Sequence, residues 1–234
     1  MSPGARRRRI EGSGGVAGTP PSVRKGWTVY ARSTTVDGRP DAVAAAVTHI
    51  REQVMPAVLR ADGYVGLSTL VDRASGGCVL TTAWRTEEAL QAADQLLRPH
   101  RDRVAELLGG CPEDEEWEIA VLHRAHASRP GACVRTVRIR VEPEQAGHEI
   151  DLHRMLLLPQ ISAFEGFCST SLLVDRPSGH AVSSVTFDDH DAMRRTRTLA
   201  AVAREPGSAE TIGEILEVAE FDLALAHLHV PELV

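Results

Sequence analysis

Apolar side chains recur every three or four positions over residues 41–59, and this spacing predicts an amphipathic helix. The apolar stripe consists of Val43, Ala46, Val47, Ile50, Val54 and Val58. Pro56 falls near the end of the segment, where a proline bends or ends a helix. A β-rich segment precedes the helix, and Gly63 marks the turn into the next β-rich segment.

The same kinds of signal predict the rest of the first half. Thr86 is suited to cap a helix over residues 86–108, because Glu87 and Glu88 follow it and favour the positive end of the helix dipole. Glycines at 109 and 110 end that helix. Four strands are predicted by β-rich runs between turn residues, at residues 27–36, 64–72, 78–84 and 116–123. The first half therefore has the order β-α-β-β-α-β.

The same order of predicted elements occurs twice along the chain. Residues 62–76 recur 103 positions later as residues 165–179, with Gly, Ser, Leu, Val, Asp, Arg, Ser and Gly at the same places and no gap. The same offset pairs Pro56 with Pro159 and Trp84 with Phe187. The second set of strands is predicted at residues 133–141, 167–174, 180–187 and 218–225. Its helices are predicted at residues 145–163 and from Asp188 or Asp189 to about 204.

We predict an α+β fold of two tandem ferredoxin-like units that pack sheet-to-sheet as a barrel within one chain. In such a unit both helices cover one face of a four-stranded sheet, and a bare apolar second face would exceed what monomers expose. Residues 29–34 lack a clean alternation of apolar and polar side chains, which suits a sheet covered on both sides. The predicted divisions are a leader at 1–26, units at 27–126 and 133–234, and a linker at 127–132.

Composition indicates a soluble chain of ordinary type, with 43% hydrophobic and 25% charged residues. No apolar run approaches the roughly 18–20 residues needed to cross a bilayer. Arg6 to Arg9 stand near the start, but no apolar stretch follows them, so we expect no export. Four cysteines without CxxC spacing are typical of reduced, mostly buried thiols in a cytoplasmic protein.

Charge is unevenly distributed along the chain. Residues 1–26 carry a net charge of +5, whereas residues 27–234 sum to −11. The basic, low-complexity segment is predicted to be a disordered leader, although it could also touch nucleic acid or a membrane. The acidic body argues against nucleic-acid binding by the folded part. Arginine outnumbers lysine 25 to 1, which is typical of a GC-rich coding sequence and favours an actinobacterial source.

Three segments of the first half carry a family resemblance. They are the helix end over residues 54–59, the turn over 62–66, and the strand end with the following helix start over 82–90. Together they resemble the antibiotic-biosynthesis-monooxygenase family of the dimeric α+β barrel superfamily, and residues 158–193 resemble a more diverged copy. In that family two separate chains usually pair their sheets, so the resemblance implies two fused copies in one chain.

The resemblance implies chemistry that ranges from cofactor-free oxygenation of polyketide quinols to haem degradation. Haem-degrading members share an Asn on the first strand, a Trp at the end of the third and a His in the following helix. Trp84 matches the Trp, but the first strand offers Tyr30, Arg32 and Thr34 and no Asn, and the helix has no His before His100. Two of the three positions fail, so we expect neither haem nor another cofactor.

The candidate ligand site lies in the first unit. Tyr30 and Arg32 share one face of the first strand, Trp84 ends a strand of the same sheet, and His49 lies on a helix that must cover this sheet. Together they suit an anionic planar ligand such as a phenolate, with Tyr30, Arg32 and Trp84 as binding residues and His49 as the candidate catalytic residue. The alternative is structural: a packed tryptophan, an ion-paired arginine and a partly exposed histidine. His153 of the second unit is a further acid–base candidate.

Histidine pairs near the ends of the fourth strands invite a metal interpretation. They are His123 with His126 and, in the second unit, His227 with His229. A His-x-His pair on a strand places both rings on one face, where zinc or copper can bind. No Cys or carboxylate cluster accompanies these pairs in the sequence, so we expect exposed loop histidines and no metal.

Both copies retain an Asp-Arg pair at the corner of the predicted hairpin, as Asp72-Arg73 and Asp175-Arg176. We expect a turn role, in which Asp accepts backbone N–H groups and the following Ser-Gly closes the loop.

Three functions fit these observations. The first is a cofactor-independent monooxygenase-like enzyme that acts on a small aromatic or quinol substrate. The alternative is a non-catalytic small-molecule-binding or stress-response barrel, and the third is an interaction module whose leader contacts a partner. Since the first unit keeps Tyr30, His49 and Trp84, we expect a site there. The expected partner is a small molecule, bound by a self-contained pseudo-dimer that could pair further as a homodimer.

Overall fold

The computed structural model describes residues 28–196 and 213–228. In the first half the strands are β1 (Val29–Val36), β2 (Tyr64–Val71), β3 (Cys78–Trp84) and β4 (Pro112–Arg124). A helical segment between β1 and β2 consists of η1 (Pro40–Ala42), α1 (Val43–His49), η2 (Ile50–Val54) and α2 (Met55–Val58). The long helix α3 (Glu87–Leu108) lies between β3 and β4.

The second half has the same order of elements. Its strands are β5 (Cys133–Arg140), β6 (Phe167–Asp175), β7 (His180–Phe187) and β8 (Glu214–Leu228). Its helices are η3 (Pro143–Gln145), α4 (Ala146–Leu152), η4 (His153–Leu157), α5 (Leu158–Ser162) and α6 (His190–Arg195). The predicted continuation of the last helix to about residue 204, and the predicted leader at 1–26, lie outside the described residues.

Helix ends agree with the sequence signals. The Thr86 hydroxyl accepts a hydrogen bond from the backbone N–H of Ala89, at 3.1 Å, and caps α3. Gly109 ends that helix with φ of 77°, a left-handed conformation that favours glycine. Of the two aspartates proposed for α6, Asp189 is the cap: its carboxylate accepts from the N–H of Ala192 at 2.8 Å.

The first helix of each half contains a π-helical turn that the sequence pattern did not predict. In η2 the N–H of Met55 donates to the carbonyl of Ile50, five residues back, and in η4 the N–H of Leu158 does the same to His153. Each donor directly precedes a proline, which cannot donate to the preceding turn. The proline therefore does not end the helix at once, because a shifted hydrogen-bond pattern carries the helix past it to Val58 and Ser162.

The eight strands form one closed barrel in the order β1-β3-β2-β8-β5-β7-β6-β4, and the neighbours are antiparallel. The long strand β4 pairs with β1 and, over its second part, with β6 of the other half, where the ladder contains a bulge between Ile119 and Val121. The long strand β8 likewise pairs with β5 and β2. The predicted α+β barrel within one chain is confirmed, and the halves share backbone hydrogen bonds at both of its seams.

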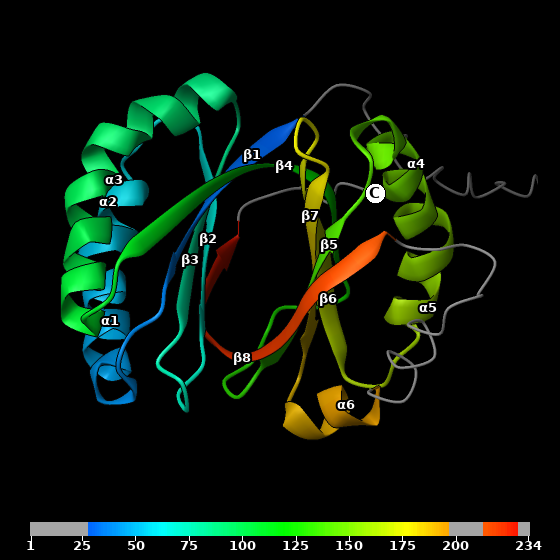
Figure 1. Ribbon diagram of the computed structural model, residues 1–234. Coiled ribbons are helices and arrows are strands. Elements are labelled where there is room, and N and C mark those ends of the chain that lie inside the picture. Colours follow the sequence, from blue (N-terminus) through cyan, green and yellow to red (C-terminus); the bar gives the residue numbers. More distant parts are fainter. Residues whose placement is uncertain (1–27, 197–212, 229–234) are drawn as a thin grey trace, which may run out of the picture.

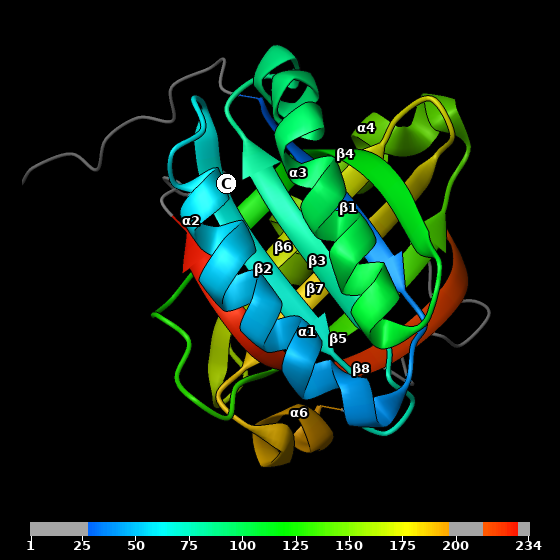
Figure 2. The ribbon, with the colours of Figure 1, turned by 90° about the vertical axis from the view of Figure 1, so that its left-hand side faces the viewer.

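Three layers of core follow from this barrel, one beneath each group of helices and one inside the barrel. Helices α1 to α3 lie on one side and α4 and α5 on the opposite side (Figure 1), and Figure 2 shows the first group crossing β2 and β3. Between α1–α3 and the sheet lies a large apolar cluster that includes Val54, Leu97 and Trp84. Inside the barrel, Ala31 and Trp117 of the first half meet Leu173 of the second. The inner faces of both sheets are thus buried, as the pattern predicted.

The hairpin corners confirm the predicted turn role of the aspartates. The Asp72 carboxylate accepts from the N–H of Ala74 at 2.8 Å and from the Ser75 hydroxyl at 2.6 Å. In the other half Asp175 accepts from the hydroxyl of Ser178. The arginines do something else: Arg73 pairs with Asp222 of β8, and Arg176 with Glu118 of β4. Each hairpin thus forms an ion pair with the fourth strand of the other half.

The cysteines behave as the sequence predicted. All four are free thiols, and three of them, Cys78, Cys133 and Cys168, are buried. Among the described residues no helix has both the length and the apolar character that a membrane crossing requires.

Candidate functional site

The structure brings three of the sequence-predicted site residues onto one face of the first sheet. Tyr30 lies opposite Trp84 in the β1–β3 ladder, and both side chains face the cluster under α1–α3. Trp84 is 1% exposed, its indole N–H donates to the Thr82 hydroxyl at 3.1 Å, and its ring meets that of Tyr64 edge-on. Its surroundings are those of a packed core residue.

Arg32 is buried in a network of charges beneath α3. Its guanidinium donates to the carboxylates of Asp94 on α3 and Glu116 on β4. Arg101 donates to Asp94 as well, at 2.5 Å, and lies 3.3 Å from Asp114. Hydrogen bonds from Arg98 and Arg101 hold the pKa of Asp94 at about 2. The guanidinium of Arg32 is therefore already neutralised by acidic partners.

His49 lies apart from that face, at the contact of α1 with α3. Its ring centroid is 5.8 Å from that of His100, and its Nε2 is buried without a hydrogen-bond partner. Burial lowers the pKa of His49, and the neighbouring His100 and Arg103 lower it further. Ligand binding by Tyr30, Arg32 and Trp84 with catalysis by His49 stays a prediction.

Tyr30 also lines a cleft of about 220 Å³ where the two halves meet. The other lining residues come from α3, β4 and the β6–β7 hairpin: Glu87, Leu90, Glu116, Trp117, Glu118, Val174, Asp175, Arg176 and Pro177. Four of these residues are acidic and one is basic, so this cleft suits a neutral or cationic group better than the anionic ligand expected from the sequence.

The second half has a smaller, more enclosed cavity between its first helix and the sheet. It holds about 20 Å³, room for about one water molecule. Eight of its lining residues are apolar: Ile139, Val141, Ala146, Ile150, Leu157, Leu172, Val174 and Ala181. The two ionisable residues on its wall are Glu149 of α4 and His153 at the start of η4. They are four residues apart on one helical segment and so share a face.

The pKa of the His153 imidazole is strongly shifted by its position in the wall of this cavity. It is 3% exposed, and its Nε2 is buried with no hydrogen-bond partner. Burial, with a smaller effect from Arg154, lowers its pKa from 6.5 to about 4, so the ring is neutral at pH 7. Burial also raises the pKa of Glu149. A titratable pair with shifted pKa values in an apolar cavity is typical of acid–base sites.

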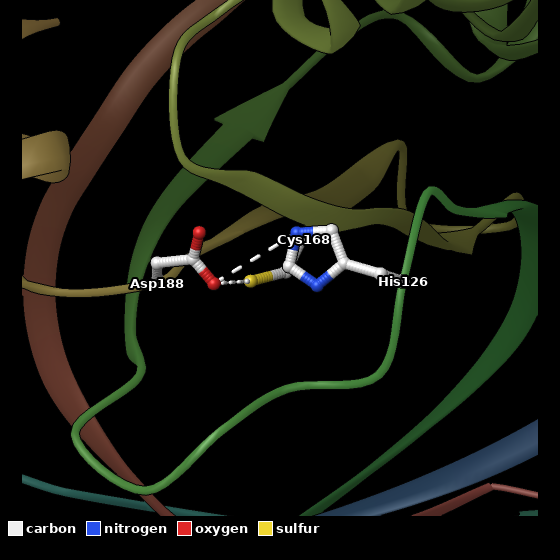
Figure 3. Close-up of side chains that lie close together, drawn as sticks. All are labelled: His126, Cys168 and Asp188. Atoms are coloured by element: carbon white, nitrogen blue, oxygen red, sulfur yellow. Dashed lines mark hydrogen bonds and ion pairs between the residues drawn. The ribbon is translucent and has the colours of Figure 1, made fainter.

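A third group lies at the opposite end of β6 and β7 and corrects an expectation from the sequence (Figure 3). His126, just after β4, lies beside Cys168 of β6 and Asp188 at the end of β7, and their ligand atoms are all within 4.8 Å of one another. A Cys and a carboxylate therefore do accompany one of the histidine pairs. Burial and the hydrogen bond to Asp188 raise the pKa of the Cys168 thiol to about 12.

Two of the remaining histidines, His123 and His227, have aromatic neighbours. His123 stacks on Phe167, with ring centroids 6.0 Å apart. His227 stacks on Tyr64, whose hydroxyl lies 3.0 Å from its Nδ1. His229 lies outside the described residues.

Sequence reasoning missed the group of His126, Cys168 and Asp188 because its members are far apart in the chain. One signal was present: at the 103-residue offset, Cys168 stands in place of Val65 and Asp188 in place of Arg85. Both departures from the repeat introduce side chains that bind metals. Considered together with His126, they could have predicted the group of three.

Comparison with known sequences gives relatives in mycobacteria. The chain is 49% identical over 223 residues to uncharacterized protein Rv2557 of Mycobacterium tuberculosis, across 95% of this chain and 100% of the relative. Uncharacterized protein Rv2558 of the same organism is 47% identical over 229 residues, across 97% of each chain. No protein-family model matches the sequence.

Solved structures share the fold at low sequence identity. A candidate monooxygenase from Fusobacterium nucleatum aligns with a TM-score of 0.66 and 11% identity, over 86% of this chain and 95% of that one. An anthrone oxidase-like protein aligns with a TM-score of 0.59 and 12% identity, over 90% and 96%. A Listeria monocytogenes ferredoxin-fold protein related to antibiotic biosynthesis monooxygenases gives 0.51 and 11%, over 87% and 98%. The fold implied by the family resemblance is therefore confirmed.

Proposed function

We propose that this chain, which belongs to the family of the Mycobacterium tuberculosis proteins Rv2557 and Rv2558, is a monooxygenase-like enzyme for a small aromatic or quinol substrate. The observation that carries the proposal is the buried, unpartnered Nε2 of His153 on the wall of a cavity whose other lining residues, Glu149 apart, are apolar. An unsatisfied buried polar atom costs about 1–3 kcal/mol, so a site that retains one is expected to use it on a bound molecule.

In this proposal His153 accepts a proton from the substrate. The low pKa keeps the imidazole neutral, so a basic nitrogen is available at physiological pH. Proton transfer creates an imidazolium next to a substrate anion, and the two charges attract strongly in an apolar cavity. An ionised Glu149, one helical turn away, would stabilise the imidazolium further. The chain's own contribution is thus to deprotonate the substrate and exclude water.

The electron-rich anion is then oxidised by dioxygen, which is the second substrate. For a methylene group between aromatic rings, CH2 and O2 give C=O and H2O: one oxygen atom enters the product and the other leaves as water. For a simple quinol, two electrons and two protons pass to O2 and give the quinone and hydrogen peroxide. Both reactions begin with the proton that His153 accepts.

Access to the cavity requires motion of the helix above it. A space of about 20 Å³ does not admit an aromatic ring, so the helix must move away from the sheet. The π-helical turn at His153–Leu157 lies at this place, and single π turns inside α-helices occur frequently at functional sites. The exposed side chains of Met155 and Leu156, 68% and 39% accessible, lie on this turn.

The structural neighbours support the reaction class only through their fold. The candidate monooxygenase and the anthrone oxidase-like protein carry names for oxygen chemistry on this barrel. The proposal for this chain rests on its own cavity. The location departs from the sequence expectation, which placed the site in the first unit.

The alternative function is a barrel that binds a small molecule without turning it over. The small, mainly aliphatic cavity favours this alternative, because Glu149 and His153 are the two polar residues that line it. Binding without turnover and catalysis differ in whether oxygen is consumed.

The test measures oxygen uptake and quinone absorbance with anthrone and hydroquinone substrates. The wild-type chain is expected to consume oxygen, and His153→Gln to be slower by about 100-fold or more, the usual contribution of a general base. His148→Gln, an exposed histidine on the same helix, is the matched control and should keep full activity. Thermal melts of all three proteins check that they fold.

The outcomes separate the two functions. No oxygen uptake combined with a ligand-dependent rise in the melting temperature, absent in His153→Gln, would establish the binding alternative. If the chain showed no oxygen uptake and no thermal shift with these compounds, both functions would be overturned.

A further inference from the structure

Three metal-binding atoms converge at one end of β6 and β7, away from the cavity of His153. The Cys168 Sγ lies 3.3 Å from Asp188 Oδ1, and the His126 Nε2 lies 3.8 Å from the same oxygen. Two ligands of a tetrahedral zinc ion, each at about 2.0–2.3 Å from the metal, lie about 3.5 Å apart. Two of the three separations are therefore already close to those of a zinc site, and the third pair of ligand atoms lies within 4.8 Å.

Backbone hydrogen bonds hold the three residues in place. The segment that carries His126 is attached to Cys168 itself, because the N–H groups of Ala125 and His126 donate to the Cys168 carbonyl at 2.8 and 3.4 Å. The N–H of Asp188 donates to the carbonyl of Gly166 at 2.8 Å, two residues before Cys168. The ligand set is thus pre-positioned on a rigid sheet end and its adjoining loop.

The ring of His126 presents the correct nitrogen. Its Nδ1 lies 3.1 Å from the carbonyl oxygen of Ala127, which can only accept, so Nδ1 carries the proton. In the neutral ring Nε2 then has a free lone pair directed to the Asp188 carboxylate, which is also an acceptor. Two acceptors that face one another call for a proton or a metal ion between them, and a ligating histidine whose other nitrogen donates to a carbonyl is the usual arrangement at metal sites.

The fold itself does not require these side chains. In the first half the N–H of Arg85 makes the same bond to Gly63 that Asp188 makes to Gly166, at 2.8 Å. Positions equivalent to Cys168 and Asp188 there hold Val65 and Arg85, and the strands pair in the same way. Among the described residues, His126, Cys168 and Asp188 form a group of side chains that could together hold a metal ion.

We propose that His126, Cys168 and Asp188 bind a zinc ion with an open fourth position. One nitrogen, one sulfur and one oxygen ligand suit Zn²⁺, whereas magnesium and calcium prefer oxygen alone. Cys168 is fully buried, but the side chains of His126 and Asp188 are 40% and 33% exposed, so solvent reaches two of the three ligand side chains. Binding releases the thiol proton to solvent, and the open position takes a water molecule. The site is independent of the proposed function.

The experiment measures zinc binding to the full chain, purified with a chelator and a reductant. A chromophoric chelator competes for Zn²⁺, and Co²⁺ serves as a second probe because thiolate ligation gives a near-ultraviolet charge-transfer band. We expect one zinc per chain and a cobalt–thiolate band. Cys168→Val, which copies the residue of the first half, should lose the band and weaken zinc binding at least about tenfold.

Two further variants keep the test decisive. Asp188→Asn changes a partly exposed residue, so the chain is expected to fold, and its zinc affinity should fall by a similar factor. Cys78→Val removes another buried thiol and should bind zinc like the parent chain. No zinc binding, or binding that survives in both Cys168→Val and Asp188→Asn, would overturn the proposal.

Discussion

At the scale of single residues, His153 shows how burial sets both stability and the proposed chemistry. Its pKa of about 4 lies below the 6.5 of an exposed imidazole, because burial disfavours the charged ring. Above pH 6.5 the ring is neutral in the folded and unfolded chains and contributes nothing to the pH dependence. As the pH falls from 6.5 to 4 only the unfolded chain takes up the proton, so stability falls.

The first prediction follows from that shift. The free energy of unfolding should drop by about 3 kcal/mol between pH 7.5 and pH 4 through His153 alone, at about 1.4 kcal/mol for each unit of pKa. In His153→Leu this part of the fall in the free energy of unfolding at acidic pH should be absent. At pH 7.5 the variant should be as stable as the parent or more stable. Urea denaturation at several pH values measures it, with His148→Leu as control. If the free energy of unfolding of His153→Leu fell with decreasing pH as steeply as that of the parent, the imidazole would be solvated in the folded chain.

Single residues also mark the limit of sequence reasoning. The two-residue period of a strand correctly placed Tyr30 and Arg32 on one face of β1, and the structure adds Trp84 to that face. It could not reveal that Arg32 contacts Asp94, 62 residues away, or that His126 meets Cys168 and Asp188. Such contacts depend on strand order and loop paths, which residue spacing does not encode.

At the scale of elements, helix α3 is attached to the sheet by charge as well as by apolar packing. Asp94 is 16% exposed at its side chain and accepts hydrogen bonds from Arg32, Arg98 and Arg101. The side chains of Arg32 and Arg101 are only 9% and 7% exposed, so both guanidinium groups depend on nearby carboxylates. Removing Asp94 leaves buried positive charge with fewer partners, which is costly.

The second prediction tests this network. Asp94→Asn should destabilise the chain by about 3 kcal/mol, the cost of breaking a buried ion pair. Asp102→Asn, on the exposed face of the same helix, should change stability by less than about 0.5 kcal/mol. The pKa of about 2 for Asp94 also means that its contribution persists above pH 3.8 and is lost as the pH falls from 3.8 to 2. Chemical denaturation at pH 7 measures the difference between the variants; equal stabilities would show that the network contributes nothing.

Elements were predicted better than contacts, for a physical reason. The apolar period of residues 41–59 and the caps at Thr86 and Gly109 are local signals, and the structure has these helices within one or two residues. The π turns were not predicted, because the three- and four-residue spacing of apolar positions was interpreted as a regular α-helix. Only the proline in each copy hinted at an altered hydrogen-bond pattern.

At the scale of the whole molecule, the repeated sequence made the barrel predictable, since a unit with one bare sheet face needs a second unit. It did not reveal how the seams close. Strand β4 has 13 residues and β8 has 15, and each leaves its own sheet to pair with the other half. The hairpin ion pairs Arg73–Asp222 and Arg176–Glu118 close the same two seams from outside.

The last prediction concerns the independence of the halves, and with it the proposed division into units at 27–126 and 133–234. Expressed alone, either half would expose the edges of two strands and an apolar inner face that includes Trp117 or Leu173. Open edges and apolar surface of this kind promote aggregation. We therefore expect each half alone to be unfolded or aggregated, and the two halves co-expressed to form a one-to-one complex with the helix content of the intact chain.

Circular dichroism and size-exclusion chromatography with light scattering measure these outcomes. The control is the intact chain cleaved at a protease site within the linker, residues 127–132, which should stay assembled because both seams are held by strand pairing. If each half instead purified as a stable, soluble monomer, the seams would contribute little, and the barrel would be two self-sufficient domains that merely lie side by side.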